Sequence, residues 1–184
     1  MLKNKKSLGQ NWLKDRDMLL AIAELAKTDG VDTVLEIGPG LGTLTSALFK
    51  YFDQVIAVEL DAELAAKLPK SFPGKNLTVK NQDILALDLS QLNLPENYVV
   101  AGNIPYYITS PIIQKFLHTN QTPQRIVFLV QKEVAERLAG APGDYSVLGL
   151  TAQSYAKVSL GPVVKRDLFT PAPKVDSQVV VLTP

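Results

Sequence analysis

Three glycines at alternate positions, Gly38, Gly40 and Gly42, constrain this sequence more than any other feature. An apolar, β-prone segment at residues 33–35 precedes them, and residues 44–52 have the composition of a helix. Glycine allows positive φ angles and lets a ligand approach the backbone, and the helix that follows offers unpaired N–H groups. The sequence therefore predicts a turn between a strand and a helix that binds a nucleotide-like cofactor. A tight turn without a ligand is the alternative.

The spacing of these glycines selects among cofactors. The dinucleotide fingerprint G-x-G-x-x-G requires glycine at position 43, where this chain has Thr43. The pattern is instead G-x-G-x-G, with Glu36 two residues before the first glycine. This spacing resembles the first motif of methyltransferases that use S-adenosylmethionine. The resemblance implies that Glu36, Gly38 and Gly40 contact S-adenosylmethionine and its product S-adenosylhomocysteine.

Strand-like and helix-like segments alternate along the rest of the chain. A first helix carries Leu19 and Ile22, with Asp15 or Asp17 as its N-cap. Further strands are expected at residues 54–59, 76–81, 98–102, 125–130, 156–164 and 178–182, and further helices at residues 62–68, ending before Pro69, and at 111–117, 132–138 and 146–155. This alternation predicts an α/β fold, a Rossmann-like, doubly wound and mostly parallel sheet of about seven strands. Because no helix separates the last two strands, we expect an antiparallel last strand.

Composition limits the class of protein. A chain of 184 residues is long enough for one domain, which we expect to span residues 1–184. The chain has no cysteine and one histidine, His118, so we expect no metal site. We find no apolar segment long enough to span a membrane and therefore expect a cytoplasmic monomer without a membrane partner.

Polar residues follow the predicted strands at their carboxyl ends, where doubly wound sheets bind ligands. Glu59 ends the strand at 54–59 and could accept hydrogen bonds from both hydroxyls of a ribose. Asp83 follows the strand at 76–81 and could accept a hydrogen bond from the adenine amino group. The backbone N–H of Ile84 could donate to the same ring. These residues are predicted to bind the cofactor.

Asn103, Ile104, Pro105 and Tyr106 follow the strand at 98–102 and indicate the chemistry. The exocyclic amine of adenine is a poor nucleophile because its lone pair is delocalised into the ring. The side-chain oxygen of Asn103 and the carbonyl of Ile104 could accept both N–H groups and aim the lone pair at a methyl group. Pro105 would fix the turn, and Tyr106 would offer a ring for stacking. The alternative is an Asn-x-Pro turn with a core tyrosine.

These four residues are therefore our catalytic candidates, and Asn103 is also expected to contact the cofactor. Catalysis would come mostly from alignment and electrostatics. Phe169 is a fifth candidate, because the prolines at positions 171 and 173 stiffen its loop and could hold its ring against the other face of a base. An ordinary core phenylalanine is the alternative for Phe169.

Taken together, these motifs resemble the ribosomal RNA adenine dimethyltransferase family over almost the whole chain. Residues 8–13 resemble its N-terminal motif, with Trp12 where phenylalanine is usual. The resemblance assigns cofactor contacts to Asn11 and Leu13. Residues 131–138 and 169–177 are closer to the small-subunit branch than to the antibiotic-resistance branch. The implied reaction places two methyl groups on N6 of each of two adjacent adenosines near the 3′ end of small-subunit rRNA, in an immature small ribosomal subunit.

The N-terminus carries a basic arm, residues 1–16, that includes Lys3, Lys5, Lys6, Lys14 and Arg16. Such a cluster can contact phosphates, although a solvated end is the alternative. Members of the family also carry a small helical C-terminal domain, and we expect this chain to lack it.

Four other functions compete with this interpretation. The Asn-x-Pro-Tyr chemistry is shared with large-subunit rRNA methyltransferases of the antibiotic-resistance type and with DNA adenine methyltransferases. A protein that binds RNA as an assembly factor, without catalysis, is a further alternative. A nicotinamide dehydrogenase is disfavoured by Thr43.

Overall fold

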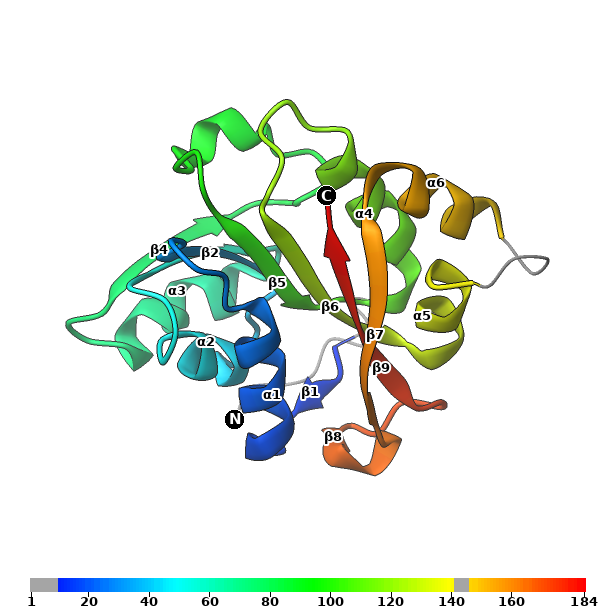
Figure 1. Cartoon of the computed structure of the whole chain (residues 1–184). Helices are drawn as coiled ribbons and strands as arrows, with labels where there is room; N and C mark the ends of the chain where they lie inside the picture. Colours follow the sequence, from blue (N-terminus) through cyan, green and yellow to red (C-terminus); the bar gives the residue numbers. More distant parts are fainter. Residues whose placement is uncertain (1–9, 141–145) are drawn as a thin grey trace.

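The computed structural model describes residues 10–140 and 146–184. Its centre is a seven-stranded sheet in the order β4-β3-β2-β5-β6-β9-β7 (Figure 1). The first five strands in this order are parallel, and β9 pairs antiparallel with both β6 and β7. The predicted fold class, including the antiparallel last strand, is therefore confirmed. The strands are β2 (Thr33–Ile37), β3 (Gln54–Glu59), β4 (Asn76–Asn81), β5 (Val99–Asn103), β6 (Arg125–Gln131), β7 (Lys157–Val164) and β9 (Ser177–Thr183).

Helices cover both faces of this sheet (Figure 1). Residues of α1 and α2 pack with alternate strand residues in one hydrophobic cluster, and residues of α4, α5 and α6 pack in the other. In β2, for example, Val34 belongs to the first cluster and Leu35 to the second, as expected for a strand buried on both faces. The helices are α1 (Arg16–Ala26), α2 (Thr43–Leu48), α3 (Ala62–Ser71), α4 (Thr109–Leu117), α5 (Lys132–Leu138) and α6 (Val147–Tyr155), with 3₁₀ turns at η2 (Leu89–Leu92), η3 (Tyr106–Ile108) and η4 (Arg166–Leu168).

The starts of α2, α4 and α6 lie within one or two residues of the prediction, at Thr43, Thr109 and Val147, and two helix ends also differ from it. The helix α3 was expected to end before Pro69 but continues to Ser71. Pro69 lies in the last turn, where its missing N–H removes a single hydrogen bond and the helix ends soon afterwards. The helix α2 ends at Leu48 rather than at Phe52, because the N–H of Lys50 bonds three residues back to Ala47 and tightens the chain.

A second, two-stranded sheet was not predicted. Its strands are β1 (Trp12–Leu13) and β8 (Phe169–Thr170), which pair antiparallel. The carbonyl of Leu13 also accepts a hydrogen bond of 3.1 Å from the hydroxyl of Thr43, at the start of α2. This small sheet and the bond to Thr43 hold residues 10–13, which we call the N-terminal segment, beside the glycine-rich turn.

One of the two predicted N-cap residues of the first helix is confirmed. Asp15 caps α1 by accepting a hydrogen bond from the backbone N–H of Met18. The pairing of β7 with β9 shifts between Leu160 and Val163, where the sequence has glycine and proline. None of the helices in the described part of the chain has the length and apolarity needed to cross a membrane. Residues 1–9 of the basic arm lie outside the described residues.

Candidate active site

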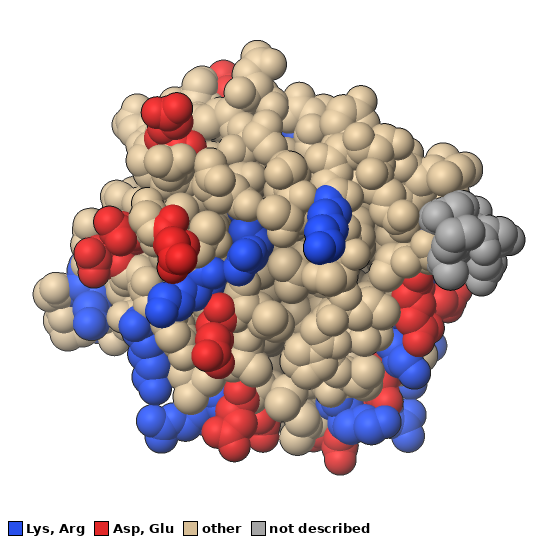
Figure 2. Space-filling model, viewed as in Figure 1, with Lys and Arg blue, Asp and Glu red and all other residues tan. Residues whose placement is uncertain are grey.

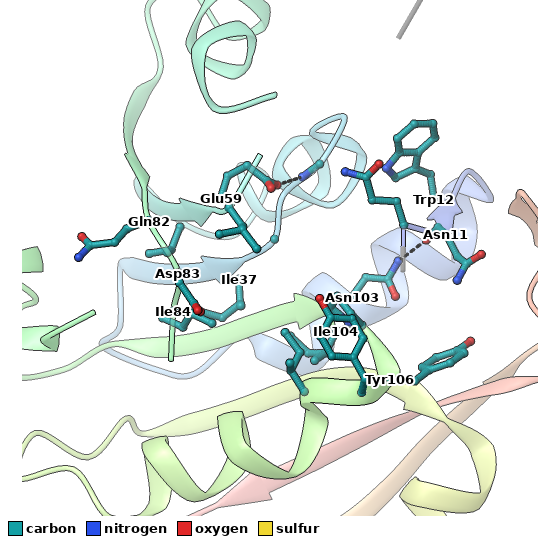
Figure 3. Close-up of a pocket in the computed structure, with 18 residues that line it drawn as sticks. Asn11, Trp12, Ile37, Glu59, Gln82, Asp83, Ile84, Asn103, Ile104 and Tyr106 are labelled. Atoms are coloured by element: carbon teal, nitrogen blue, oxygen red, sulfur yellow. Dashed lines mark hydrogen bonds between the residues drawn. The ribbon is translucent and has the colours of Figure 1, made fainter. Parts of the chain in front are cut away.

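A pocket lies at the carboxyl ends of β2, β3, β4 and β5 (Figure 3). Most of the predicted site residues line it: Asn11, Gly38, Gly40, Glu59, Asp83, Ile84, Asn103, Ile104, Pro105 and Tyr106. Leu13 and Glu36 instead line a smaller neighbouring pocket, which shares Trp12, Gly38 and Asn103 with the first. Phe169 lines neither of these two pockets. The topology thus gathers residues from the N-terminus to position 106 at one edge of the sheet.

The glycine-rich turn has the backbone conformation that its composition predicts. Gly38, Gly40 and Gly42 have φ angles of 65°, 56° and 80°, which other residues rarely adopt. Apart from its two chain neighbours, no described residue has an atom within 4 Å of a Cβ placed at Gly38. At Gly40 an added Cβ would lie 3.2 Å from the indole nitrogen of Trp12. The turn therefore leaves room on the pocket side at Gly38, while Gly40 packs against the N-terminal segment.

Glu59 joins the glycine-rich turn to the end of β3. Its carboxylate oxygens accept the backbone N–H of Gly40 at 3.0 Å and that of Asp61 at 2.8 Å. The side chain is 6% exposed, and burial raises its pKa. A carboxylate offers about four lone-pair positions, so these two bonds leave acceptor capacity that can face the pocket. The contact with Gly40 was not predicted.

Glu36 lies in a different environment from Glu59, although the strands that carry them are neighbours. It is 1% exposed, and one of its oxygens accepts a hydrogen bond of 2.6 Å from the hydroxyl of Thr45. The other oxygen has no hydrogen-bond partner among the described residues. Burial raises the pKa of Glu36 to about 8. Glu36 is therefore neutral over much of the physiological pH range when the pocket holds no cation.

Two further residues shape the adenine side of the predicted cofactor site. The side chain of Asp83 accepts the backbone N–H of Leu85 at 2.9 Å and so begins the turn that carries Ile84. The amide of Asn81 donates to the carbonyls of Glu59 and Leu60, at 2.8 and 3.1 Å. Leu60 is half exposed and lines the pocket.

The side-chain amide of Asn103 is oriented by the N-terminal segment. Its nitrogen donates to the backbone carbonyl of Asn11 at 2.9 Å (Figure 3). With the nitrogen bound in this way, the oxygen Oδ1 is the end available to an incoming donor. The N–H of Ile104 donates to the carbonyl of Leu129 at 3.1 Å, which extends the pairing of β5 with β6 by one residue. Pro105, with φ −56° and ψ 133°, then turns the chain into η3.

Tyr106 is held at its hydroxyl, which lies 3.0 Å from the hydroxyl of Ser177. Burial raises the pKa of Tyr106, so the phenol stays protonated at neutral pH. The next residue, Tyr107, also lines the pocket and is 61% exposed. Eight described residues of the pocket were not predicted as site residues: Gln10, Trp12, Ile37, Val58, Leu60, Gln82, Tyr107 and Ile108. For Trp12, its place next to Asn11 in the N-terminal motif was an available signal.

Phe169 is 4% exposed and belongs to the hydrophobic cluster that includes α1 and α2. It pairs with Leu13 across the small sheet. The structure therefore places Phe169 among core residues and not beside Tyr106 on the wall of the pocket. A stacking role for Phe169 stays a prediction, and it would require the ring to leave this cluster.

Comparison with known proteins identifies the family. The model of the family described as ribosomal RNA adenine dimethylase matches residues 1–184. The chain belongs to this family. A relative from Pediococcus pentosaceus, named ribosomal RNA small subunit methyltransferase A, is 39% identical over 100% of this chain and 64% of its own length. This chain thus spans a little under two thirds of that relative.

Two solved structures of the same family type are also similar. The 23S rRNA methyltransferase ErmE is 35% identical, with a TM-score of 0.83 over 94% of this chain and 69% of its own. A dimethyladenosine transferase from Plasmodium falciparum is 34% identical, with a TM-score of 0.83 over 94% of this chain and 62% of its own. The fold of rRNA adenine dimethylases is therefore present here.

Proposed function

We propose that this protein transfers methyl groups from S-adenosylmethionine to N6 of two adjacent adenosines near the 3′ end of small-subunit rRNA. The observation that carries the proposal is the fixed amide of Asn103, whose nitrogen is bound by Asn11 and whose oxygen is left as an acceptor. This acceptor lies on the same pocket as the glycine-rich turn and Glu59. Membership of the rRNA adenine dimethylase family supports the same reaction.

The residues of the pocket fit S-adenosylmethionine. Gly38 has no Cβ, and none of the residues 10–140 and 146–184 other than its chain neighbours has an atom within 4 Å of where a Cβ would lie, which suits close approach by a ligand. Glu59 keeps acceptor capacity for the ribose hydroxyls, and Asp83 with Ile84 can recognise adenine by one acceptor and one backbone donor. Glu36 lines the adjoining pocket, and one of its buried oxygens has no partner among the described residues. This oxygen can accept a hydrogen bond from the amino group of the methionine part of the cofactor.

The cofactor supplies a methyl group on a positively charged sulfur and leaves as a neutral thioether. The protein must then orient the adenine amine. Asn103 Oδ1 and the carbonyl of Ile104 accept its two N–H groups, which turns the lone pair out of conjugation. Pro105 fixes the direction of that carbonyl, and Tyr106 supports the face of the base. No strong general base is needed, because an N-methylated ammonium loses its proton readily.

The choice of RNA rests on the relatives. The relative from Pediococcus pentosaceus is named for the small ribosomal subunit, as is one from Macrococcus caseolyticus at 42% identity. ErmE, named for 23S rRNA, is 35% identical. A large-subunit substrate is therefore the second candidate, and small-subunit rRNA or an immature small subunit is the first.

We further propose that residues 1–184 form a methyltransferase domain. This domain binds S-adenosylmethionine without help from other parts of a protein, and it binds RNA weakly. On the face shown in Figure 2, acidic and basic side chains lie interspersed, with no broad field of one sign. The formal net charge is +1. Phosphate contacts supply much of the affinity of proteins for RNA, so a nearly neutral surface binds RNA weakly.

The test is mass spectrometry of nucleosides after incubation with isotopically labelled S-adenosylmethionine. Substrates are immature small subunits, free small-subunit rRNA, large-subunit rRNA and single-stranded DNA. We expect N6,N6-dimethyladenosine in the small-subunit samples only, and labelling that is slower on the order of 10²-fold or more with Asn103→Ala. Label in large-subunit rRNA alone would select the second candidate, and no label in any sample would contradict the proposal.

A further inference from the structure

Ser177 occupies a fixed point at the carboxyl edge of the sheet. It is the first residue of β9 and pairs on one side with Gln131 of β6 and on the other with Val164 of β7. It is 1% exposed. A residue that is paired with strands on both sides has little freedom to move, so its hydroxyl has a defined position.

This hydroxyl contacts Tyr106, a residue 71 positions earlier in the chain, at 3.0 Å. The other end of Tyr106 is also constrained. Its backbone begins η3 directly after Pro105, whose carbonyl accepts the N–H of Ile108 at 3.2 Å. The hydroxyl oxygen of a tyrosine lies on the axis of χ2, so a contact at the hydroxyl restricts χ1, whereas a side chain held only at its Cα can change χ1 freely. Ser177 therefore fixes the position of the Tyr106 ring.

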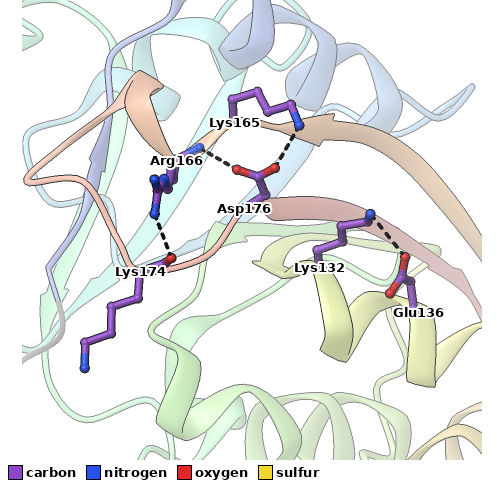
Figure 4. A network of polar contacts seen from close by, with 6 residues as sticks. All are labelled: Lys132, Glu136, Lys165, Arg166, Lys174 and Asp176. Atoms are coloured by element: carbon purple, nitrogen blue, oxygen red, sulfur yellow. Dashed lines mark hydrogen bonds and ion pairs between the residues drawn. The ribbon is translucent and has the colours of Figure 1, made fainter.

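The residue before Ser177 is anchored independently. Asp176 accepts the side-chain ammonium of Lys165 at 2.9 Å and the backbone N–H of Arg166 at 3.0 Å (Figure 4). The carbonyl of Asp176 accepts the N–H of Lys132, the first residue of α5, at 3.1 Å. These contacts join the loop before β9 to the end of β7 and to the start of α5. The position of Ser177 is thus fixed by β6, β7 and α5, and none of these elements carries a predicted cofactor-binding or catalytic residue.

We propose that Ser177 is a positioning residue for methyl transfer, which holds the ring of Tyr106 at the position from which it stacks on the target base. The proposal rests on the proposed function, since it assumes that Tyr106 supports an adenine. It adds that this support is preset before RNA binds, by a hydroxyl from the last strand of the sheet. A preset ring costs the complex no ordering of that side chain when the base enters.

The effect of removing the contact follows from the strength of a hydrogen bond. Ser177→Ala is expected to lower kcat for RNA methylation by about 3- to 10-fold, the range that corresponds to one net hydrogen bond. Tyr106→Phe removes the same contact from the other side and should have a similar effect. If both act through one contact, the double variant should be no slower than the slower single variant. Effects that multiply would contradict the proposal.

The control is Ser159→Ala, which removes an exposed serine hydroxyl from β7 of the same sheet. This variant should keep the wild-type kcat. Calorimetry should give the same affinity for S-adenosylmethionine in all variants, and thermal melting should show them folded. A loss of cofactor affinity that parallels the loss of kcat would show a general disturbance of the pocket and would contradict the proposal.

An independent measurement separates this inference from the proposed function. In protein with ¹³C-labelled tyrosine rings, the Tyr106 signals are assigned by their absence in Tyr106→Phe. We expect them to shift or broaden in Ser177→Ala and to stay unchanged in Ser159→Ala. Unchanged signals in Ser177→Ala would overturn the inference even in an active enzyme. If the signals shift in Ser177→Ala but the wild-type protein methylates no RNA, only the proposed function and the stacking role are overturned.

Discussion

The two walls of the pocket are held in place in different ways. On the wall that is predicted to bind the cofactor, together with the smaller pocket beside it, the defining contacts join residues that are close in sequence. Gly40 and Glu59 are 19 residues apart, and Glu36 and Thr45 are nine apart. On the wall that carries the predicted catalytic residues, Asn103 bonds to Asn11 at a separation of 92 residues, and Tyr106 bonds to Ser177 at a separation of 71. The first wall belongs to one strand-helix-strand unit, while the second is assembled from both ends of the chain.

This difference has a functional meaning. A wall built within one unit forms with the sheet itself, so its residues affect folding as well as binding. A wall that depends on distant segments can lose its geometry while the sheet remains folded. We therefore expect substitutions on the cofactor wall to change stability and cofactor affinity, and substitutions on the catalytic wall to change turnover with little effect on either.

The largest expected effect concerns stability and belongs to Glu36. Its folded pKa of about 8 lies above the ordinary value of 4.5, so the folded protein holds a proton that the unfolded chain releases. Stability is then full below about pH 4.5 and falls as the pH rises to about 8, by roughly 1.4 kcal/mol per unit or a few kcal/mol in total. Glu36→Gln should remove this fall, as measured by urea unfolding at pH 5 and pH 8.

The matched control for Glu36 is Glu63→Gln, since Glu63 is an exposed acid on α3. It should keep the wild-type pH dependence. A wild-type protein with equal stability at both pH values would show that Glu36 is ionised in the fold, and would remove the proposed link between this wall and stability.

The second effect concerns turnover and belongs to the catalytic wall. Asn103→Ala removes one of two acceptors for the amine and should lower kcat on the order of 10²-fold or more. Cofactor affinity and melting temperature should change much less. Single-turnover methylation and calorimetry on the same samples measure both. A turnover like that of the wild type would refute the role of Asn103, and a comparable loss of cofactor affinity would erase the contrast between the walls.

The third effect concerns cofactor binding. Glu59→Ala should weaken the binding of S-adenosylmethionine by about 1.5–3 kcal/mol, the scale of hydrogen bonds to a charged group. Glu59→Gln keeps the shape and one acceptor, so its loss should be smaller. Calorimetry gives both values. An unchanged affinity in Glu59→Ala would mean that Glu59 bonds only to Gly40 and Asp61 and does not bind the cofactor.

The smallest effect concerns RNA binding, which lies outside both walls. Removing residues 1–6 deletes Lys3, Lys5 and Lys6. The plot of log affinity against log salt concentration should then become less steep by about 2, since each phosphate contact of a single strand contributes about 0.7 to the slope. A control variant with alanine at Lys50, Lys67 and Lys70 loses the same charge, one lysine from the turn after α2 and two from α3, and should keep the wild-type slope. Equal slopes for all three proteins would place the RNA surface elsewhere.

The contrast between the walls also explains what could be predicted from the sequence. The bounds of β3, β4 and α5 agree with the prediction, because apolar period and punctuating residues mark them locally. The glycine-rich turn and Glu59 were recognisable for the same reason. The strands β1 and β8 were missed, since two residues are too few to show a period.

The long-range contacts left no signal of their own. Asn103 is oriented by the backbone carbonyl of Asn11, and a carbonyl is present at every residue. Ser177 closes a predicted loop and carries an ordinary hydroxyl, so nothing in the sequence pointed from it to Tyr106. Phe169 had an aromatic ring in a proline-rich loop, which suggested stacking, but pairing with Leu13 buries it instead.

The place of β9 in the sheet has a consequence for biosynthesis. Among the described strands of this sheet β9 is synthesised last, yet it lies between β6 and β7. Until it emerges, β6 has an open edge, and five consecutive residues of β6, from Ile126 to Val130, are apolar. Such an edge can pair with other chains, so rapid insertion of β9 would protect the nascent protein from aggregation. Because Ser177 begins that strand, Tyr106 gains its anchor in the same late step of folding.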